Sequence, residues 1–391
     1  MSKPHNDAVN LTAVAIAGAV AMAAAMGFGR FSFTPILPGM ITGLPLSPAD
    51  AGLIAAGNFA GYLFGAVLAA YGWATGREWL IALASLLATA LLLGAMGISD
   101  SVPAFIAIRF LAGVASAFVL IFTSSLVLGY AGGNDHVQST HFGGVGVGIA
   151  VSSLMVAVIA ALLPPGGQGW RLDWLVGGLI TLAMTLVVWR LLPASPPAAG
   201  RTPAEPKLAW RLPLALVTLS YGLFGFGYVI TATFIVAMAR MGAAGQTIEF
   251  LTWFLTGCTA AVSIFAWQPA MVKFGLVRVY VTGLLVQAGG VLASVVLPLP
   301  AAPLVGGMLL GATFIMVTAY GLRIGRHLAP ESPRRALAFM TAAFGLGQIV
   351  GPLTAGVIAE RTGSFTVPSL LAAGALFVCA ALIVPVGRRI P

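Results

Sequence analysis

Long apolar runs alternate with short polar or turn-forming stretches along the whole chain. A helix needs about 20 mostly apolar residues to cross a bilayer, and twelve runs reach that length. Turn-forming stretches such as 44–48, 132–135 and 329–333 separate them. The predicted spans cover residues 11–40, 49–73, 79–98, 103–130, 141–163, 171–192, 212–240, 249–270, 277–298, 302–326, 335–360 and 366–387. We therefore expect an all-α membrane protein with twelve transmembrane helices.

The first predicted span carries a motif that returns in the seventh span, 198 positions later. Residues 27–40, GFGRFSFTPILPGM, and residues 225–238, GFGYVITATFIVAM, share Gly-Phe-Gly and the final methionine, and Tyr228 stands opposite Arg30. Membrane transporters are commonly built from internal repeats with the substrate site between them. The repeat predicts two pseudo-symmetric six-helix bundles joined by a proline- and alanine-rich linker. Their predicted limits are 1–192 for the N-terminal bundle, 193–211 for the cytoplasmic linker and 212–391 for the C-terminal bundle.

Composition agrees with a membrane protein and excludes several other classes. Hydrophobic residues make up 59% of the chain and charged residues 7%, whereas about a quarter of residues are charged in a soluble domain. The net charge of +9 comes from basic residues scattered singly between apolar runs, so no nucleic acid partner is expected. Cys258 and Cys379 lie in apolar runs, and neither a metal site nor a cofactor is indicated. Phosphate-cradling, hydrolase and metalloprotease motifs are missing, so we expect neither an enzyme nor an ATP-driven pump.

Basic residues fall mainly on one side of the predicted membrane. With the N-terminus inside, only Arg171, Arg240 and Arg361 of the 19 Lys and Arg residues lie on the outer side, and Arg30 and Arg109 lie within spans. Cytoplasmic loops are enriched in Lys and Arg, so we expect both termini in the cytoplasm and the protein in the cytoplasmic (inner) membrane. A cleaved signal peptide is the alternative for the first apolar run, but that run is longer than a signal core, which favours a retained helix.

Several strings resemble those of one transporter superfamily. Residues 109–113, RFLAG, resemble the Arg-x-x-x-Gly signature in the fourth span of the major facilitator superfamily, and residues 347–352, GQIVGP, resemble its Gly-x-x-x-Gly-Pro pattern. The loop at 73–77, WATGR, lacks the aspartate that the superfamily usually has there. The strings most similar to the YbfB/YjiJ-like branch are 27–31, 141–146, 227–234 and 343–348. The resemblance covers essentially the whole chain and implies transport by alternating access, without a defined substrate class.

Arg30 and Arg109 are the two charged residues well inside predicted spans. A charge at the bilayer centre costs about 2.5–3.5 kcal/mol, so it tends to face a wet cavity or a partner. Guanidinium binds carboxylate and phosphate in a bidentate manner, so Arg30 is expected to bind an anionic substrate, together with Arg109 if both face one cavity. The alternatives for Arg30 are snorkelling and a structural ion pair, for example with Asp50. The alternative for Arg109 is bonding to carbonyls of a neighbouring span.

Polar and aromatic residues on the spans that line the cavity in this superfamily are further candidates for the substrate site. The resemblance places them in spans 2, 7, 10 and 11. They are Asn58, Tyr62, Tyr228, Thr231, Tyr320, Phe344 and Gln348. Simple packing is the alternative for each of them, because a tyrosine in a span is more often packed or interfacial than bound to a ligand. Tyr228 is the strongest of the set because it occupies the repeat position of Arg30.

Proton coupling normally needs a titratable group that alternates between the two membrane faces. Asp50 and Glu249 open spans 2 and 8 at nearly equivalent repeat positions, and His141 begins span 5. We predict these three as coupling candidates. Stabilisation of a helix N-terminus is the alternative for the two carboxylates, and a solvated polar role is the alternative for His141.

Glycines spaced four residues apart mark helix faces that allow close crossing. They are Gly61 and Gly65 in span 2, Gly144 and Gly148 in span 5, and Gly347 and Gly351 in span 11. In this superfamily, span 2 slides against span 11 and span 5 against span 8, so the resemblance assigns these glycines to moving contacts. Static tight packing is the alternative.

Taken together, these features predict a secondary active or facilitated transporter that moves a small organic anion across the lipid bilayer by alternating access. We expect a monomer, with protons as the candidate coupling ion. A proton-driven exporter of drugs or metabolites is the alternative within transport. A membrane sensor that binds a ligand without moving it is the alternative of another class.

Overall fold

The computed structural model describes residues 10–163, 168–194 and 205–388. Within these ranges the regular secondary structure is entirely helical, and twelve helical stretches are long and apolar enough to cross a membrane. The twelve predicted spans are therefore confirmed. The middle of the predicted linker, residues 195–204, lies outside the described residues.

The helix boundaries fall within a few residues of those expected from the apolar runs. The first span consists of α1 (Leu11–Met22), η1 (Ala23–Phe31) and α2 (Phe33–Gly43). The other spans of the first half are α3 (Pro48–Ala70), α4 (Glu78–Ile98), α5 (Val102–Ala131), α6 (Asp135–Leu162) and α7 (Gly169–Leu191). The second half contains α8 (Leu212–Met241), α9 (Gln246–Phe274), α10 (Leu276–Val296), α11 (Ala301–Leu328), α12 (Pro333–Thr362), α13 (Thr366–Ile383) and the short η2 (Val384–Arg388).

The largest difference at a helix end concerns α6, which begins before its apolar run. The Asn134 side chain accepts hydrogen bonds from the backbone N–H groups of His136 and Val137, at 3.0 and 3.3 Å. Such a cap satisfies donors that have no partner within the helix. The helix is therefore extended by a polar first turn that hydropathy alone does not detect.

The middle of the first span is a π-helix, which the apolar pattern did not predict. This segment, η1, contains Gly27, Gly29 and Arg30, and Pro35 follows it in α2. Proline has no backbone N–H, so a carbonyl in the preceding turn is left without its usual donor. π-Helical turns are rare and often occur at functional sites. In this protein the π-helix is the segment that carries Arg30.

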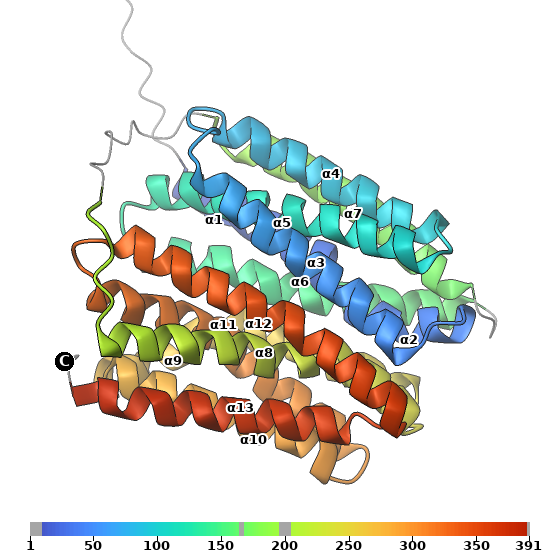
Figure 1. Ribbon diagram of the computed structural model, residues 1–391. Helices are drawn as coiled ribbons and strands as arrows, with labels where there is room; N and C mark the ends of the chain where they lie inside the picture. The colour runs from blue at the N-terminus through green and yellow to red at the C-terminus, as the bar shows by residue number, and fades with distance from the viewer. Residues whose placement is uncertain (1–9, 164–167, 195–204, 389–391) are drawn as a thin grey trace, which may run out of the picture.

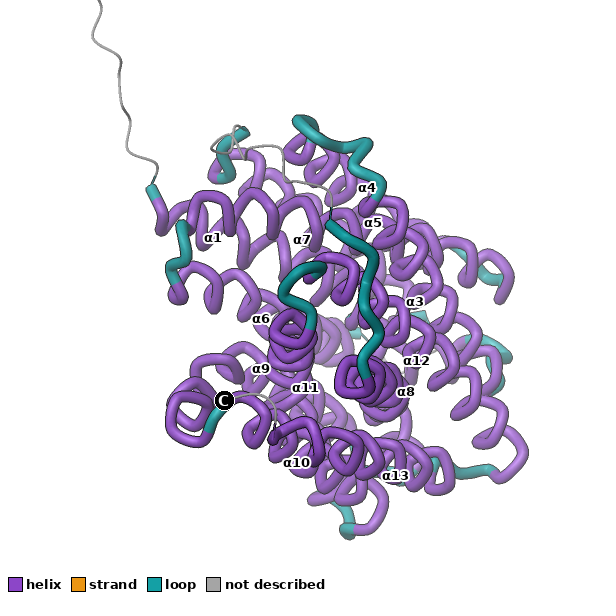
Figure 2. Tube along the Cα trace, turned by 60° about the vertical axis from the view of Figure 1, so that its left-hand side comes forward, coloured by secondary structure: helices purple, strands orange, loops and turns teal. Residues whose placement is uncertain are grey.

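The helices run side by side in two groups, α1 to α7 and α8 to α13 (Figure 1). Across the boundary between the groups, α3 packs against α12, α6 packs against α9, and α2 contacts α8. Figure 2 shows the same two groups from another side. The start of α1, the start of α8 and η2 lie at one end of the molecule, on the left in Figure 1. We call this the terminal end. The opposite end, which carries the connections 44–47 and 242–245, is the distal end.

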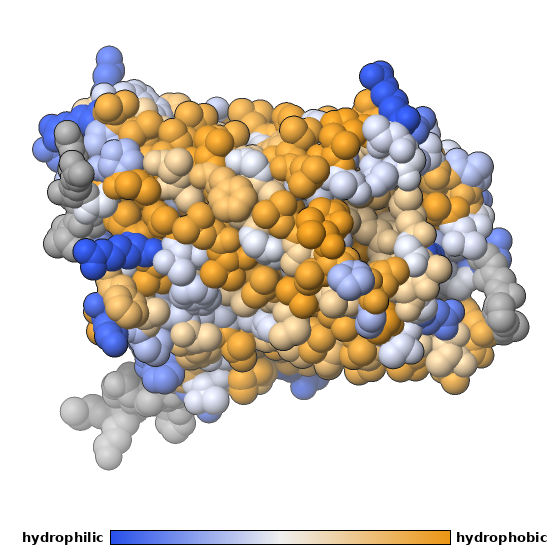
Figure 3. Space-filling view, turned by 90° about the horizontal axis from the view of Figure 1, so that it is seen from below, coloured by the Kyte–Doolittle hydropathy of each residue, from blue (hydrophilic) through white to orange (hydrophobic). Residues whose placement is uncertain are grey.

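The face of the molecule shown in Figure 3 is mostly apolar along its length, and hydrophilic residues gather toward its two ends. On the spans α4, α7 and α3, the side chains of Leu91, Leu179 and Phe64 are 66%, 66% and 50% exposed. Exposed apolar area of this extent is costly in water but not in lipid. This exposed apolar surface is therefore the one that faces the bilayer.

The described end of the linker is attached to the start of α12. The Glu205 carboxylate accepts hydrogen bonds from the backbone N–H groups of Arg334 and Arg335, both at 3.1 Å, and from Nε of Arg334 at 2.9 Å. Burial alone would raise the pKa of Glu205, but these hydrogen bonds and the charge of Arg334 hold it below its ordinary value. Glu205 thus caps the first turn of α12 from outside the helix.

Candidate functional site

Arg30 lies inside the protein near the middle of the first span. It is 4% exposed. Its guanidinium carbon lies 4.3 Å from the centre of the Tyr62 ring and 4.7 Å from the centre of the Phe59 ring, both on α3, and 5.5 Å from the ring of Phe31. A cation at these distances is attracted to the ring faces. Three aromatic rings therefore surround the guanidinium of Arg30.

The hydrogen-bonding capacity of Arg30 is not used up by the protein. Its Nε and Nη2 atoms are buried and have no hydrogen-bond partner. Among the described residues, no carboxylate forms an ion pair with Arg30. Arg30 is buried, so it does not snorkel to the membrane surface. It does not pair with Asp50, because Asp50 caps the start of α3. Burying a charge without a hydrogen-bonding partner costs free energy.

Tyr228, on α8, brings the second half to the same centre. It is 3% exposed, and its hydroxyl oxygen accepts a short hydrogen bond from Nε2 of Gln348 on α12. Its ring stacks on Phe224, Phe344 and Phe314 at centroid distances of 5.1, 5.7 and 5.9 Å. The positive charge of Arg30 acts on the hydroxyls of both Tyr62 and Tyr228. The predicted residues Arg30, Tyr62, Tyr228, Phe344 and Gln348 therefore lie together.

The two halves also touch directly beside this cluster. Phe31 makes an edge contact with Phe314 on α11, with 5.8 Å between ring centres. On the distal side of Arg30, the hydroxyl of Thr34 donates a hydrogen bond of 2.6 Å to the carbonyl of Ala232. Thr34 and Ala232 are 198 positions apart, so they are equivalent residues of the two repeats. The contact between α2 and α8 therefore closes the centre toward the distal end.

Arg109 has a different environment from Arg30. Its Nη1 and Nη2 atoms donate hydrogen bonds of 2.8 Å to the carbonyls of Gly29 and Arg30. It is 2% exposed and lies against the rings of Phe33 and Trp174. These carbonyls belong to η1, so Arg109 supplies donors to the irregular backbone that positions Arg30. The structure thus shows the alternative given for Arg109, which is bonding to carbonyls of a neighbouring span.

The remaining predicted substrate residues are buried but less central. Nδ2 of Asn58 donates a hydrogen bond of 3.0 Å to the carbonyl of Arg109, while its Oδ1 has no partner. Thr231 is fully buried and its hydroxyl has no partner. Tyr320 lies on α11, toward the terminal end from Phe314, and is 5% exposed. Asn58 therefore holds the backbone of α5 at Arg109, which in turn bonds to the backbone at Arg30.

The three coupling candidates occupy three different environments. Asp50 forms a capping box with Ser47 at the start of α3, which is the helix N-terminal role given above as its alternative. Glu249 is 8% exposed and pairs with Arg240. His141 is fully buried, and its Nε2 lies 2.8 Å from the hydroxyl of Ser124. The solvated interpretation of His141 is therefore wrong, because α6 begins one polar turn earlier than its apolar run.

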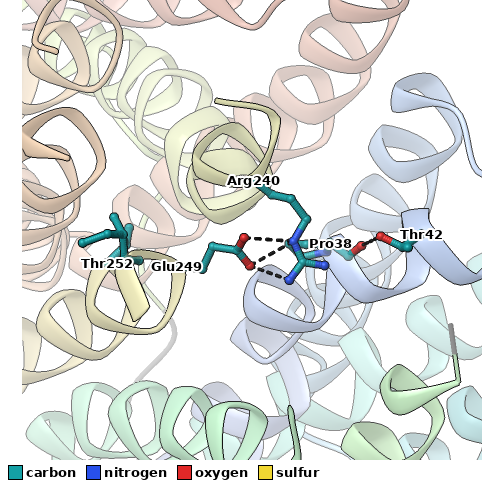
Figure 4. A network of polar contacts seen from close by, with 6 residues as sticks. Pro38, Thr42, Arg240, Glu249 and Thr252 are labelled. Atoms are coloured by element: carbon teal, nitrogen blue, oxygen red, sulfur yellow. Dashed lines mark hydrogen bonds and ion pairs between the residues drawn. The ribbon is translucent and has the colours of Figure 1, made fainter. Parts of the chain in front are cut away.

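Arg240 and Glu249 form a bidentate ion pair at the distal end. Nε of Arg240 lies 3.0 Å from each carboxylate oxygen of Glu249, and Nη2 lies 2.5 Å from Oε2. Figure 4 shows the Arg240 side chain extending from α8 between Glu249 and the part of α2 that carries Pro38 and Thr42. Glu249 thus does more than stabilise the first turn of α9.

The predicted gating glycines lie at tight contacts, but within each half. A Cβ at Gly61 would lie 1.8 Å from the carbonyl oxygen of Phe110, on α5. The other five also face helices of their own half. The neighbours are Val114 for Gly65, Ala19 for Gly144, Ala23 for Gly148, Gly222 for Gly347, and Val229 and Phe226 for Gly351. Their assignment to moving contacts between spans 2 and 11 or 5 and 8 is therefore wrong.

Other glycines carry the contacts between the halves. A Cβ at Gly146 would lie 2.1 Å from the backbone nitrogen of Ala261 on α9, and one at Gly52 would lie 2.4 Å from the carbonyl oxygen of Pro352 on α12. Spacing predicts that glycines share a helix face, but it does not identify the helix that this face meets. The spacing therefore predicted tight packing at these glycines, but not which helices they pack against.

We expect Gly61→Ala to destabilise the protein, because its Cβ would overlap the Phe110 carbonyl. Overpacking typically costs about 1–3 kcal/mol. The matched control is Gly94→Ala on α4, where no atom lies within 4 Å of the added Cβ and no destabilisation is expected. Thermal unfolding in detergent measures both. Equal stability of the two variants would contradict the close approach of α3 and α5.

Phe31, Phe59, Phe224 and Phe314 line the centre but were not predicted as site residues. A signal for one of them is present in the sequence. Phe224 precedes Tyr228 by four positions, which places both rings on one face of a helix. Aromatic residues are common in membrane spans, so this spacing becomes informative only when the neighbouring arginine is placed.

Twelve helices long and apolar enough to span a membrane, packed around a buried arginine, define a multi-span membrane protein. The chain belongs to the major facilitator superfamily, because residues 22–384 match the model of the family described as "Uncharacterised MFS-type transporter YbfB". The predicted superfamily and branch are therefore confirmed, as is the expectation that the chain is not an enzyme, since proteins of this family are transporters.

Solved structures of other transporters share the fold. A D-xylose–proton symporter is 14% identical with a TM-score of 0.75, covering 97% of this chain and 98% of the other. A bacterial homologue of the human lysosomal transporter Spinster, in an inward-facing and occupied conformation, is 15% identical with a TM-score of 0.69, covering 99% and 98%. The nucleoside transporter NupG is 14% identical with a TM-score of 0.68, covering 97% and 99%.

A curated relative is monocarboxylate transporter 11 of Homo sapiens. It is 26% identical over 279 residues, which are 62% of this chain and 55% of the relative. The chain thus spans about half the length of that relative.

Proposed function

We propose that this protein transports small monocarboxylates with an apolar or aromatic body, and that Arg30 binds the carboxylate. One observation carries the proposal. Arg30 is buried at the centre of the bundle with Nε and Nη2 unpartnered, and no carboxylate among the described residues pairs with it. An edge of a guanidinium is the group that binds a carboxylate through two parallel hydrogen bonds.

The walls around Arg30 support an apolar body for the substrate. Phe59 and Tyr62 of the first half and Phe314 and Phe344 of the second half are all less than a tenth exposed. Aromatic walls favour flat or branched apolar groups, while Tyr228 and Gln348 supply polar atoms that fix orientation. The name of the relative, a monocarboxylate transporter, fits this chemistry. A cationic drug is disfavoured because Arg30 would repel it.

Orientation and assembly belong to the same proposal. The basic loops of the terminal end support a cytoplasmic location for that end and for both termini. The distal end then faces outward from the cytoplasmic (inner) membrane, and the contact between Thr34 and Ala232 belongs to an outward gate in its closed state. The two halves act as rocking units joined by the linker, and the protein works as a monomer.

Counterflow in proteoliposomes tests the substrate class. We expect vesicles preloaded with unlabelled benzoate to take up radiolabelled benzoate, and vesicles preloaded with unlabelled benzylamine to take up no radiolabelled benzylamine. The two probes have similar rings and opposite charge, so they isolate the role of charge. Radiolabelled lactate tests whether the ring is required. Uptake of benzylamine without uptake of either carboxylate would overturn the proposal.

A further inference from the structure

A second polar site lies at the distal end, away from Arg30. A cavity of about 640 Å³ separates α2 and α7 of the first half from the ends of α8 and α9. Its charged lining residues are Asp173 from α7, and Arg240 and Glu249 from the second half. Asp173 is not among the predicted site residues, because it stands near the predicted beginning of span 6.

Asp173 is a buried carboxylate without a partner. It is 6% exposed, and its Oδ1 is buried with no hydrogen-bond partner. The indole nitrogen of the neighbouring Trp170 also lacks a partner and makes no bond to it. By contrast, Asp100 is exposed and pairs with Arg171 close by. An ionised carboxylate is rarely buried without a partner, as Asp173 is here.

Arg240 is the cation whose charge reaches Asp173, but it is already engaged. Three contacts of 2.5 to 3.0 Å hold its guanidinium to Glu249. Two carboxylates and one arginine thus line the same cavity, which carries a net negative charge when both carboxylates are ionised. Two carboxylates that share a site cannot easily both ionise, and the less well paired one takes up a proton.

We infer that Asp173 is a proton-binding gate residue that holds one proton when the distal end is closed and loses it when that end opens. Closure buries the carboxylate beside an arginine that Glu249 already pairs, so a proton must neutralise it. Opening exposes the carboxylate to water, where the ionised form is stable. In this step a proton from water on the distal side forms an O–H bond on the carboxylate, and opening reverses it.

This inference rests on the rocking of the two halves but not on the anion assigned to Arg30. Because a ligand shifts a conformational equilibrium toward the state that binds it better, protons on the distal side favour the closed state. The charged groups nearest Asp173 are Arg240 and Glu249 in the same cavity, Arg171 on α7, and Asp100, which pairs with Arg171. The elements packed against α7 also carry Arg30 on η1, Glu78 on α4, and Asp135, His136 and His141 on α6. Glu78 and the three α6 residues lie near the starts of their helices, at the terminal end, and so do not face Asp173. Asp100 pairs with Arg171 and Glu249 pairs with Arg240, so Asp173 is the carboxylate of this group that has no partner.

A metal ion is a poorer occupant than a proton. Among the described residues, no group of three or more His, Cys, Asp and Glu side chains is placed to hold a metal ion. Arg240 beside the carboxylate would also repel a second cation. Replacing sodium by choline in each experiment below checks this, and an effect of sodium in place of protons would overturn the inference.

Infrared spectroscopy of the purified full-length protein tests the proton directly. At neutral pH we expect the carbonyl stretch of a protonated carboxylic acid, which separates from carboxylate and amide bands. The band should be lost in Asp173→Asn and retained in the control Asp100→Asn. Aspartate labelled with heavy carbon at its side-chain carboxyl should shift the band, whereas labelled glutamate should not. No such band in the wild type, or a band that shifts with labelled glutamate, would overturn the assignment.

Distance measurements test the gate without any substrate. The native thiols are removed by Cys258→Ser and Cys379→Ala. Cysteines that carry spin labels are then introduced at Ser101, just before α5, and at Thr366, the first residue of α13, both at the distal end. The distance between the labels in lipid nanodiscs should lengthen as pH rises in the wild-type background and stay short at every pH in Asp173→Asn. A variant that follows the wild-type pH dependence would overturn the gate, and this outcome is independent of benzoate counterflow.

Discussion

Arg30→Met is expected to abolish carboxylate transport and to leave thermal stability unchanged or higher. Loss of one partner from a buried charge pair costs about 2–5 kcal/mol, so counterflow of benzoate should fall by roughly 30-fold or more. Stability should not fall, because Nε and Nη2 of Arg30 make no hydrogen bond within the protein and methionine removes a buried charge. Counterflow and the Tm of the same detergent preparation measure the two effects.

The control for this prediction is Arg30→Lys, which keeps the charge. A lysine ammonium cannot form the planar bidentate pair, so we expect an intermediate loss of transport. Equal loss in Arg30→Met and Arg30→Lys would mean that planar geometry matters more than charge. Wild-type counterflow in Arg30→Met would contradict the role of Arg30 in binding.

Arg109→Met is expected to have the opposite balance, with loss of stability as its first effect. The substitution leaves the carbonyls of Gly29 and Arg30 without the donors that lie 2.8 Å from each of them. An unsatisfied buried acceptor costs about 1–3 kcal/mol, so two such acceptors should lower Tm by roughly 2–7 °C in a chain of this length. The yield of folded protein should fall with it.

The same substitution at two membrane arginines is its own control. Arg30→Met and Arg109→Met remove the same guanidinium group from two buried positions, and both positions lie beside aromatic rings. The largest difference between them is the pair of hydrogen bonds that Arg109 donates to η1. A stable Arg109→Met variant that has lost benzoate binding would show that Arg109 contacts the substrate and that its bonds to η1 are dispensable.

The spans and the pairing of Arg30 with Tyr228 could be predicted because local patterns in the chain display them. A bilayer imposes a minimum apolar length, and the repeat aligns positions that a pseudo-twofold axis brings together. Gln348 and Phe344 followed from the family resemblance, and the structure places both against Tyr228. The wall of further phenylalanines required the packing of four helices, which no single run contains.

The environments of the charged and glycine residues could not be predicted, because they depend on neighbours distant in sequence. Asp50 and Glu249 occupy similar repeat positions, yet one caps its own helix and the other pairs with Arg240. The π-helix of η1 provides the carbonyls that engage Arg109, and hydropathy does not report a change of helix type. Asp173 stands near the predicted beginning of span 6, where the sequence does not show that it is buried, and it is 6% exposed.

Equilibrium binding of radiolabelled benzoate to the purified protein tests the central role of Arg30 most directly, because it needs neither vesicles nor a gradient. The wild type should bind benzoate saturably, and unlabelled lactate should compete. Arg30→Met should show no saturable binding at the same concentrations, although it unfolds at the same temperature or higher. Binding of benzoate by Arg30→Met with wild-type affinity would contradict the account.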